Sequence, residues 1–167
     1  DQGEATVFSD QDDLVRIMSI HKSKGLQFPV VFLSGMSRKF NTRSLNDAVL
    51  VDAELGIGCD YVDLENKVKI PSLKRAAIRK KLETDQLGEE LRVLYVAMTR
   101  AEEKLILTAT TGDIEKLLQK YPNADAPLSG TELQSAGCYL DWIMMAEGAE
   151  KLQRVGATRD VIELFDY

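Results

Sequence analysis

Short apolar runs that alternate with helical patterns predict a domain in which strands and helices follow one another. Residues 14–20 and 29–33 are dense in large apolar side chains, and residues 104–110 (KLILTAT) form a third run of this kind. These runs are too apolar for strands with one solvated face, so we expect strands that are buried on both faces. Such strands are typical of the parallel sheets of α/β proteins.

Helical patterns occupy much of the remaining chain. Ser72 is a suitable N-cap for a long stretch whose apolar residues recur every three to four positions. We expect Gly88 to interrupt this helix and a second helix to run over residues 89–102. A short amphipathic helix over residues 113–121 and a longer helix over residues 131–146 are also predicted.

Two segments connect these elements in ways that the pattern leaves open. Residues 48–51, 56–62 and 67–70 predict short strands that would form a small hairpin-like excursion. The polar residues 21–26 join two predicted buried strands, although neighbouring parallel strands require a longer crossover. Either this loop carries a helical turn, or the second strand, residues 29–33, lies elsewhere in the sheet.

Length and composition indicate one domain with a sizeable core and no membrane span. The chain has 167 residues, 44% of them hydrophobic, but no apolar run is long enough to cross a bilayer. Residues 1–13 are acidic and polar, so we expect a loose end rather than a signal peptide. The first residue is not methionine, which suggests a piece of a longer, cytoplasmic protein. Cys59 and Cys138 predict two buried, reduced thiols, and we expect no metal bound within this chain.

The net charge of −6 conceals two basic stretches. Six lysines and arginines and no acidic residue lie in residues 14–46, and seven lie in residues 67–81, again without an acid. Phosphate contacts act at short range under salt screening, so a local basic surface is sufficient even on an acidic protein. The alternative is a solvated face without a ligand, and we favour this alternative for residues 67–81.

The basic loop between the first two predicted strands has residues suited to phosphate. It follows a predicted parallel strand, at the edge where open α/β sheets bind ligands. Lys22, Ser23 and Lys24 supply hydrogen-bond donors, and Gly25 permits a close backbone approach. His21 can contact a phosphate or a base, although a lone histidine is more often structural.

Arg100 stands at the end of the second predicted helix, within Thr99-Arg100-Ala101. An arginine at the mouth of a nucleotide site can stabilise the charge of a transferring phosphoryl group. Spacing alone favours an ion pair with Glu102 or Glu103 on a solvated face. The chain has no GxxxxGK[ST] loop, so it cannot by itself bind and hydrolyse a nucleotide in the usual P-loop manner.

Two long segments resemble motifs of a known family. IMSIHKSKGLQFPVVFLSGM, at residues 17–36 and overlapping the stretch 15–34, resembles the fifth motif of superfamily 1 DNA helicases of the UvrD, PcrA and RecB kind. EELRVLYVAMTRAEEKLIL, within residues 88–110, resembles the sixth. The flanking sequence, down to YLDWI, is most similar to the AddA (RexA) subunits of bacterial AddAB helicase–nucleases. The resemblance implies that residues 14–112 form part of a RecA-like α/β domain, domain 2A, followed by a helical extension over residues 113–167.

The resemblance also implies roles for individual residues. Arg100 would reach the γ-phosphate of ATP that is bound by the opposite motor domain. Gly25 and Gln27 would lie at the nucleotide, with position 27 at the ribose. Arg92 and Tyr95 would support the sixth motif without binding a ligand. The residues that would contact or sense single-stranded DNA are His21, Lys22 and Ser23.

The implied parent protein couples ATP hydrolysis to translocation on DNA and to its unwinding, in double-strand-break repair. ATP and Mg²⁺ would be its cofactors, an AddB (RexB)-type subunit its partner, and exonuclease activity its second function. The Mg²⁺ ligands and nuclease residues would lie outside this chain, which alone should be inactive. Gln27 departs from the family, because many members have glutamate there and the charge is lost.

Two alternatives remain open at the level of sequence. One is a UvrD-like helicase without a nuclease, and the sequence beyond residue 167 would decide it, because an AddA-type chain continues into a nuclease domain with four cysteines. The other is a helicase-like module that binds DNA or protein without catalysis. The presence of Gly25 and Arg100 argues against that module.

Overall fold

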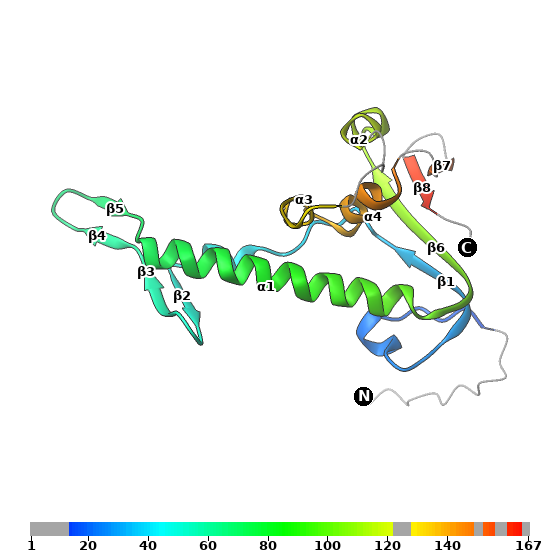
Figure 1. Cartoon of the computed structure of the whole chain (residues 1–167), viewed down its shortest axis with the longest axis horizontal. Helices are drawn as coiled ribbons and strands as arrows, with labels where there is room; N and C mark the ends of the chain where they lie inside the picture. Colours follow the sequence, from blue (N-terminus) through cyan, green and yellow to red (C-terminus); the bar gives the residue numbers. More distant parts are fainter. Residues whose placement is uncertain (1–13, 122–127, 149–151, 156–159, 165–167) are drawn as a thin grey trace, which may run out of the picture.

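The protein is built around a small sheet and one long helix, as Figure 1 shows. The structure is a computed structural model that describes residues 14–121 and 128–148, and the backbone of residues 152–155 and 160–164. The 3₁₀ turns are η1 (Ile20–Ser23) and η2 (Arg43–Asn46), and the helices are α1 (Leu73–Met98), α2 (Ile114–Lys120), α3 (Gly130–Gln134) and α4 (Tyr139–Glu147). The strands are β1 (Phe28–Ser34), β2 (Val49–Asp52), β3 (Gly56–Cys59), β4 (Tyr61–Asp63), β5 (Val68–Ile70), β6 (Ala101–Thr111), β7 (Leu152–Val155) and β8 (Asp160–Leu164).

The central sheet has the strand order β1-β6-β8-β7. Strand β1 runs parallel to β6, with Val30 opposite Lys104 and Leu33 opposite Leu107. Strand β8 pairs antiparallel with both β6 and β7. The predicted α/β architecture with a parallel pair is therefore confirmed, and it is consistent with part of a RecA-like domain.

The core lies on one face of this sheet. Leu105, Leu107 and Ala109 of β6 alternate toward that face, as a strand with period two requires. They belong to one buried cluster with Leu94 and Ala97 of α1 and with four residues of α4. The α4 members of the cluster are Leu140, Trp142, Ile143 and Met144.

Helix α1 is a single helix of 26 residues. Ser72 caps it as predicted, because its hydroxyl accepts a hydrogen bond from the backbone N–H of Arg75 at 3.1 Å. The predicted break at Gly88 is wrong, and so is the separate helix over residues 89–102. One interior glycine costs a helix only about 1 kcal/mol, and Leu94 and Ala97 are buried on the far side of it.

Helix α4 is held by an aromatic cluster and a carboxylate. The rings of Phe40, Tyr139 and Trp142 pack with centroids 5.0 to 6.2 Å apart. Asp141 accepts hydrogen bonds from the Gly137 backbone N–H at 2.7 Å and from the Tyr121 hydroxyl at 2.6 Å. Burial and the nearby Asp141 carboxylate raise the pKa of Tyr121 to about 12.

The predicted helix over residues 131–146 is in fact two helices. Residues 135–138 separate α3 from α4, and Cys138 forms an isolated β-bridge with Lys39 at that point. A continuous helix could not make this bridge, so the tertiary contact decides the break. Cys138 is buried as expected, but Cys59 is exposed, which corrects the prediction of two buried thiols.

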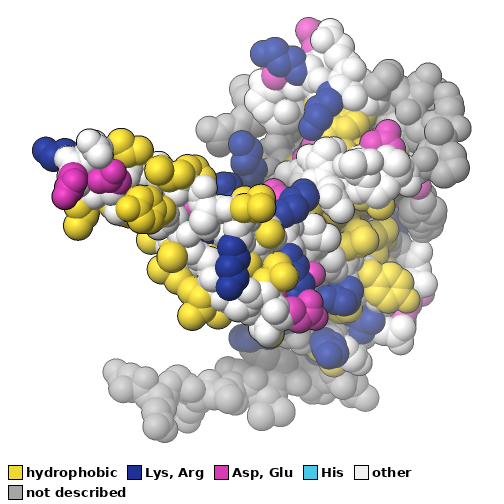
Figure 2. Space-filling view, turned by 60° about the vertical axis from the view of Figure 1, so that its left-hand side comes forward, with side chains coloured by type: hydrophobic (Ala, Val, Ile, Leu, Met, Phe, Trp, Pro, Cys, Tyr) yellow, Lys and Arg dark blue, Asp and Glu magenta, His cyan; other side chains and the backbone are white. Residues whose placement is uncertain are grey.

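Two hairpins, β2–β3 and β4–β5, lie at the N-terminal end of α1 and confirm the predicted β excursion. The predicted run 56–62 is divided between β3 and β4 at Asp60. Asp60 forms ion pairs with Lys69 at 3.3 Å and Arg75 at 3.5 Å, and Asp52 pairs with Lys81 at 2.8 Å. Figure 2 shows apolar side chains over this end of the molecule, where Ile57 is 61% exposed.

Two further expectations need correction. Residues 14–19 form no strand, and no described strand pairs with them; Val15 and Ile17 are 94% and 97% exposed. Apolar density alone does not make a strand, because a strand also needs a hydrogen-bonding neighbour. The extension over residues 113–167 contains the three helices α2, α3 and α4, but it also contributes β7 and β8 to the central sheet.

Candidate functional site at the end of helix α1

The site lies where α1 ends and β6 begins. Thr99 is the C-cap of α1, and β6 starts at Ala101, so Arg100 occupies the turn between them. The backbone N–H of Phe28 donates to the Arg100 carbonyl at 2.9 Å, and β1 begins there alongside β6. Two segments that are 72 residues apart in sequence therefore meet at one end of the parallel pair (Figure 1).

The Arg100 guanidinium is held by three neutral acceptors. Its Nε donates to the carbonyl of Val96 at 2.9 Å, and its Nη1 donates to the carbonyl of Leu26 at 2.9 Å. Its Nη2 donates to the hydroxyl of Thr99 at 3.0 Å. Arginine has five N–H donors, so one donor on each terminal nitrogen has no acceptor among the described residues.

The alternative role of Arg100 as a surface ion-pair residue has no support in the structure. Within the described part of the chain, no ion pair joins Arg100 to Glu102 or Glu103. Its positive charge faces carbonyl and hydroxyl dipoles instead. A cation that is oriented in this way, with two free donors, is suited to a doubly coordinated anion such as a phosphate.

The loop that contacts Arg100 begins with the 3₁₀ turn η1. Ser19 caps this turn, since its hydroxyl accepts a hydrogen bond from the Lys22 backbone N–H at 3.4 Å. The Ser23 hydroxyl donates to the Ile20 carbonyl at 2.7 Å. The helical turn expected as one of two options for this loop is therefore present. No crossover is needed, because residues 14–19 form no strand.

Gly25 turns the loop back toward β1. Its φ of +84° lies in the left-handed region that glycine adopts readily. A Cβ atom built on Gly25 would have no atom within 4 Å, so the backbone there is open to an approaching ligand. Gln27 follows two residues later and is exposed.

The predicted DNA-contacting residues do not all face solvent. His21 and Lys22 are exposed, whereas Ser23 is only 7% exposed and its hydroxyl is used inside η1. The structure therefore brings His21 and Lys22 to the surface of the loop. Ser23 shapes the turn that carries them.

Arg92 and Tyr95 lie on an outer face of α1. The Arg92 side chain is 73% exposed and forms an ion pair with Glu89 at 2.6 Å, one helical turn away. Tyr95 is 69% exposed. The side chains of both residues point away from the core, and the backbone carbonyl of Tyr95 accepts a hydrogen bond from the Thr99 N–H at 3.0 Å.

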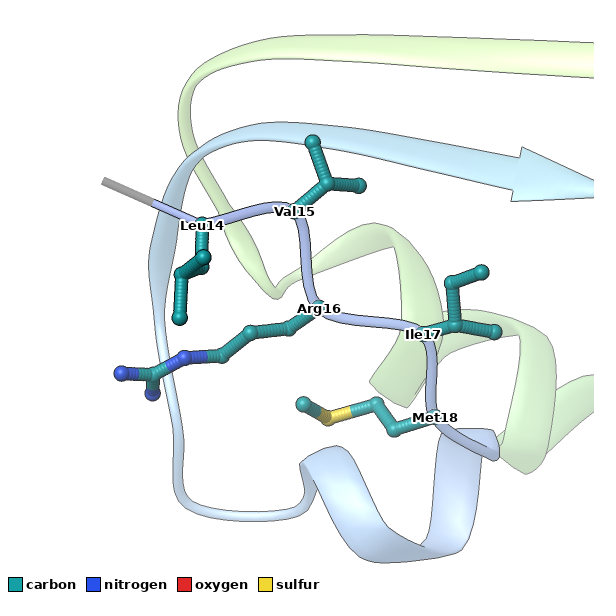
Figure 3. Close-up of a pocket in the computed structure, with 5 residues that line it drawn as sticks. All are labelled: Leu14, Val15, Arg16, Ile17 and Met18. Carbon is teal, nitrogen blue, oxygen red and sulfur yellow. The ribbon is translucent and has the colours of Figure 1, made fainter. Parts of the chain in front are cut away.

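A cavity of about 580 Å³ lies beside this region, along the segment that precedes η1. Figure 3 shows an extended chain here, with Arg16 and Met18 pointing to one side and Val15 and Ile17 to the other. Neither Arg100 nor the loop 21–27 lines the cavity. Its lining residues are Leu14, Val15, Arg16, Ile17 and Met18.

The second basic stretch, residues 67–81, is distant from Arg100 along α1 and is largely paired with carboxylates. Lys69 and Arg75 contact Asp60, and Lys81 contacts Asp52. Burial acts to raise the pKa of the Asp60 carboxyl, but Lys69, the Ser72 N–H and Arg75 outweigh it and lower that pKa. Lys69, Arg75 and Lys81 therefore attach the hairpins to α1, and this corrects the solvated-face interpretation for these three residues.

Neither a metal cluster nor a membrane span is found in the described ranges. No group of three or more His, Cys, Asp or Glu side chains there could hold a metal ion. No described helix is both long and apolar enough to cross a membrane.

Sequence reasoning missed three groups of this site: the carbonyls of Leu26 and Val96, and the hydroxyl of Thr99. Backbone carbonyls have no sequence signature, so the first two could only come from the fold. A hydroxyl residue directly before an arginine at a helix end was a signal that could have identified Thr99.

Comparison with known proteins shows the family of the chain. The model of the UvrD-like helicase C-terminal domain matches residues 2–112, and the chain belongs to this family. The match spans both the basic loop and the turn that carries Arg100.

Similar curated proteins are named as the A-type subunits of ATP-dependent helicase/nucleases. The relative from Clostridium botulinum is 47% identical over 87% of this chain and 12% of its own length. The relative from Listeria monocytogenes is 46% identical over 86% of the chain and 12% of its own length. The relative from Bacillus cytotoxicus is 41% identical over 100% of the chain and 14% of its own length. The chain thus spans only about an eighth of the length of these relatives.

Proposed function

We propose that this chain is the part of an ATP-dependent DNA helicase that presents Arg100 to a nucleotide held by another motor domain. The observation that carries the proposal is the hydrogen bond from Arg100 to the Leu26 carbonyl, which joins the two helicase-like segments. This bond and the family membership together favour a shared nucleotide site over a surface ion pair.

The chemistry of Arg100 follows from its charge and its free donors. Charge accumulates on the γ-phosphate oxygens during phosphoryl transfer, and a positioned guanidinium stabilises that charge. The chain has no phosphate loop of its own, so the nucleotide must be bound mainly elsewhere. Gly25 and Gln27 would line the same nucleotide from the basic loop, with Gln27 as a hydrogen-bonding partner of the ribose.

We also propose that the basic loop contacts single-stranded DNA. His21 and Lys22 are exposed on η1 and can reach a phosphate backbone, while Ser23 maintains the turn from inside. Leu26, at the other end of the same loop, accepts the hydrogen bond from Arg100. A shift of the loop on DNA would therefore change the position of the arginine.

For the whole protein we propose an AddA-type helicase and nuclease that acts in double-strand-break repair in the cytoplasm. ATP with Mg²⁺ would be its cofactor, and an AddB-type subunit its partner. Residues 14–112 would be the domain 2A portion, and residues 113–167 would lead toward the next domain. The names of its relatives support the helicase and nuclease activities.

The test is the ATPase activity of the full-length protein with single-stranded DNA, for wild type and Arg100→Ala. Loss of an arginine finger lowers turnover on the order of 10³–10⁵-fold, and we expect a loss in this range with DNA binding retained. Lys116→Ala is the control, because Lys116 is an exposed cation on α2 whose side chain is 83% accessible. Equal ATPase rates for wild type and Arg100→Ala would refute the proposed nucleotide site.

A further inference from the structure

The hydroxyl of Thr99 lies between the last turn of α1 and the Arg100 guanidinium. Its oxygen is 3.0 Å from the carbonyl oxygens of Tyr95 and Val96, and 3.0 Å from Nη2 of Arg100. A hydroxyl has one hydrogen and two lone pairs. Thr99 therefore shares its one hydrogen between the carbonyls of Tyr95 and Val96 and accepts a hydrogen bond from Arg100, and it links the arginine to the helix end.

Thr99 is the one contact of Arg100 that comes from a side chain among the described residues. The other two acceptors are the backbone carbonyls of Val96 and Leu26. The Leu26 carbonyl belongs to the basic loop that precedes β1. Val96 fixes only Nε, near the base of the guanidinium. Thr99 is thus the acceptor that attaches a terminal nitrogen of Arg100 to the end of α1, whereas Leu26 attaches the other to the loop.

We propose that Thr99 is a positioning residue for Arg100, and that it orients the two free N–H donors toward the phosphate that Arg100 contacts. This inference rests on the proposed function of Arg100. An arginine side chain has many rotamers, and an anchored guanidinium loses less entropy when it binds. The effect of Thr99 would therefore appear in ATP hydrolysis, the step in which Arg100 is proposed to act.

A positioning role has a specific kinetic consequence. Arg100 is expected to stabilise the transition state more than bound ATP, so a misplaced guanidinium lowers kcat while KM for ATP changes little. A purely structural role of Thr99 would instead lower the thermal unfolding temperature and weaken DNA binding in parallel. The two roles are therefore separable by measurement.

The experiment compares Thr99→Val, Thr99→Ala and Thr99→Ser in the full-length protein, with single-stranded DNA and ATP concentrations that are varied up to saturation. Valine keeps the branched shape of threonine and removes the hydroxyl, whereas serine keeps the hydroxyl. Alanine also removes the hydroxyl, and it shows whether an effect of valine comes from a folding defect that only valine causes. We expect Thr99→Val and Thr99→Ala to lower kcat about tenfold or more, as the loss of one hydrogen bond to a charged group predicts. Thr99→Ser should remain close to wild type.

Thr84→Val is the matched control. The Thr84 hydroxyl also donates to the carbonyl one turn back in α1, that of Lys80, at 3.1 Å, but Thr84 is exposed and does not contact Arg100. The same type of helix hydrogen bond is thus removed without disturbing the arginine. We expect kcat and KM of Thr84→Val to equal those of wild type.

Arg100→Ala and the double variant Thr99→Val/Arg100→Ala complete a double-mutant cycle with wild type and Thr99→Val. If Thr99 acts through Arg100, Thr99→Val adds no further loss once the arginine is gone. If Arg100→Ala abolishes turnover but Thr99→Val behaves like Thr84→Val, the inference about Thr99 is overturned and the proposed function stands. If Arg100→Ala retains full turnover, the proposed function fails and the role of Thr99 fails with it.

Discussion

At the scale of single residues, close approaches of the backbone decide which side chains are tolerated. Gly58 of β3 lies against the first turn of α1, where a Cβ atom would be 2.8 Å from the Arg75 Cα and 3.0 Å from its backbone nitrogen. These are backbone atoms of a helix and cannot move away without shifting α1. Glycine at position 58 therefore allows the β2–β3 hairpin to pack on the helix.

Gly58→Ala should destabilise the protein. Overpacking of this kind costs about 1–3 kcal/mol, and we expect a loss of unfolding free energy in that range from chemical denaturation of the chain. Gly112→Ala is the control, because a Cβ atom at Gly112 would meet no atom within 4 Å. An unchanged unfolding free energy for Gly58→Ala would show that β3 is not held this close to α1.

At the scale of elements, the length of α1 connects the hairpins to the Arg100 turn. The helix passes through Gly88 without a break, and a Cβ atom at Gly88 would have no atom within 4 Å. The residues on both sides of Gly88 are strong helix formers, and the buried Ile78 and Leu94 anchor both halves. The side-chain pattern alone could not show this continuity, because glycine is found both inside helices and at their ends.

Gly88→Ala therefore distinguishes a continuous helix from an interrupted one. Within a continuous helix, alanine should stabilise the chain by about 0.5–1 kcal/mol, because it loses less backbone entropy than glycine. Chemical denaturation followed by circular dichroism at the helix band would measure the change. A loss of stability would indicate that the chain needs glycine at position 88 for a bend.

The docking of the hairpins on α1 should depend on pH. The Asp52 pKa lies below its ordinary value of 3.8 mainly because Lys81 donates a hydrogen bond to it, and the Asp60 pKa is also lowered. A folded-state pKa below the unfolded value contributes stability above the unfolded pKa, and this stability is lost as pH falls through the folded value. We therefore expect this contribution to be complete at neutral pH and to be lost progressively as the pH falls below about 4.

Asp52→Asn/Asp60→Asn isolates that contribution from the other carboxylates with lowered pKa, such as Asp113 and Asp141. The difference in unfolding free energy between wild type and this variant should be largest near neutral pH and should shrink as the solution becomes more acidic. Chemical denaturation at several pH values measures this difference. A difference that does not vary with pH would mean that the two ion pairs do not anchor the hairpins.

At the scale of the whole molecule, α4 completes the core over the sheet. Trp142 is 5% exposed, packs against Phe40 and Tyr139, and donates from Nε1 to the Leu133 carbonyl at 2.9 Å. Tyr139 donates a hydrogen bond from its hydroxyl to Glu90 of α1, so α4 also contacts the helix that ends at Arg100. Helix α4 is therefore part of the same packed unit as β6.

Trp142→Ala should remove this anchor. Truncation of a buried tryptophan costs about 3–5 kcal/mol, and we expect a loss of this size in the unfolding free energy of the chain. Tyr61→Ala is the comparison, because Tyr61 is also a large aromatic residue but is 65% exposed on β4. Equal effects of the two substitutions would contradict the packing of α4 on the sheet.

The sequence by itself determined the local elements and the family. Apolar spacing predicted β1, β6 and the helical stretch over α1, and the Ser72 cap placed the start of α1, because these signals depend on neighbours within a few residues. The basic loop and the Thr99-Arg100-Ala101 segment were also visible as two candidate halves of one site. Their long, ordered likeness to helicase motifs identified the family before any contact was known.

Only the tertiary structure decided what depends on distant partners. Residues 14–19 have the composition of a strand but no neighbour to pair with among the described strands, and residues 131–146 break where Cys138 meets Lys39. Spacing alone favoured an ion pair of Arg100 with Glu102 or Glu103, but the fold brings the Leu26 carbonyl to its guanidinium. Backbone carbonyls are the same in every residue, so their place in a site follows from how the strands and helices pack and not from the order of side chains.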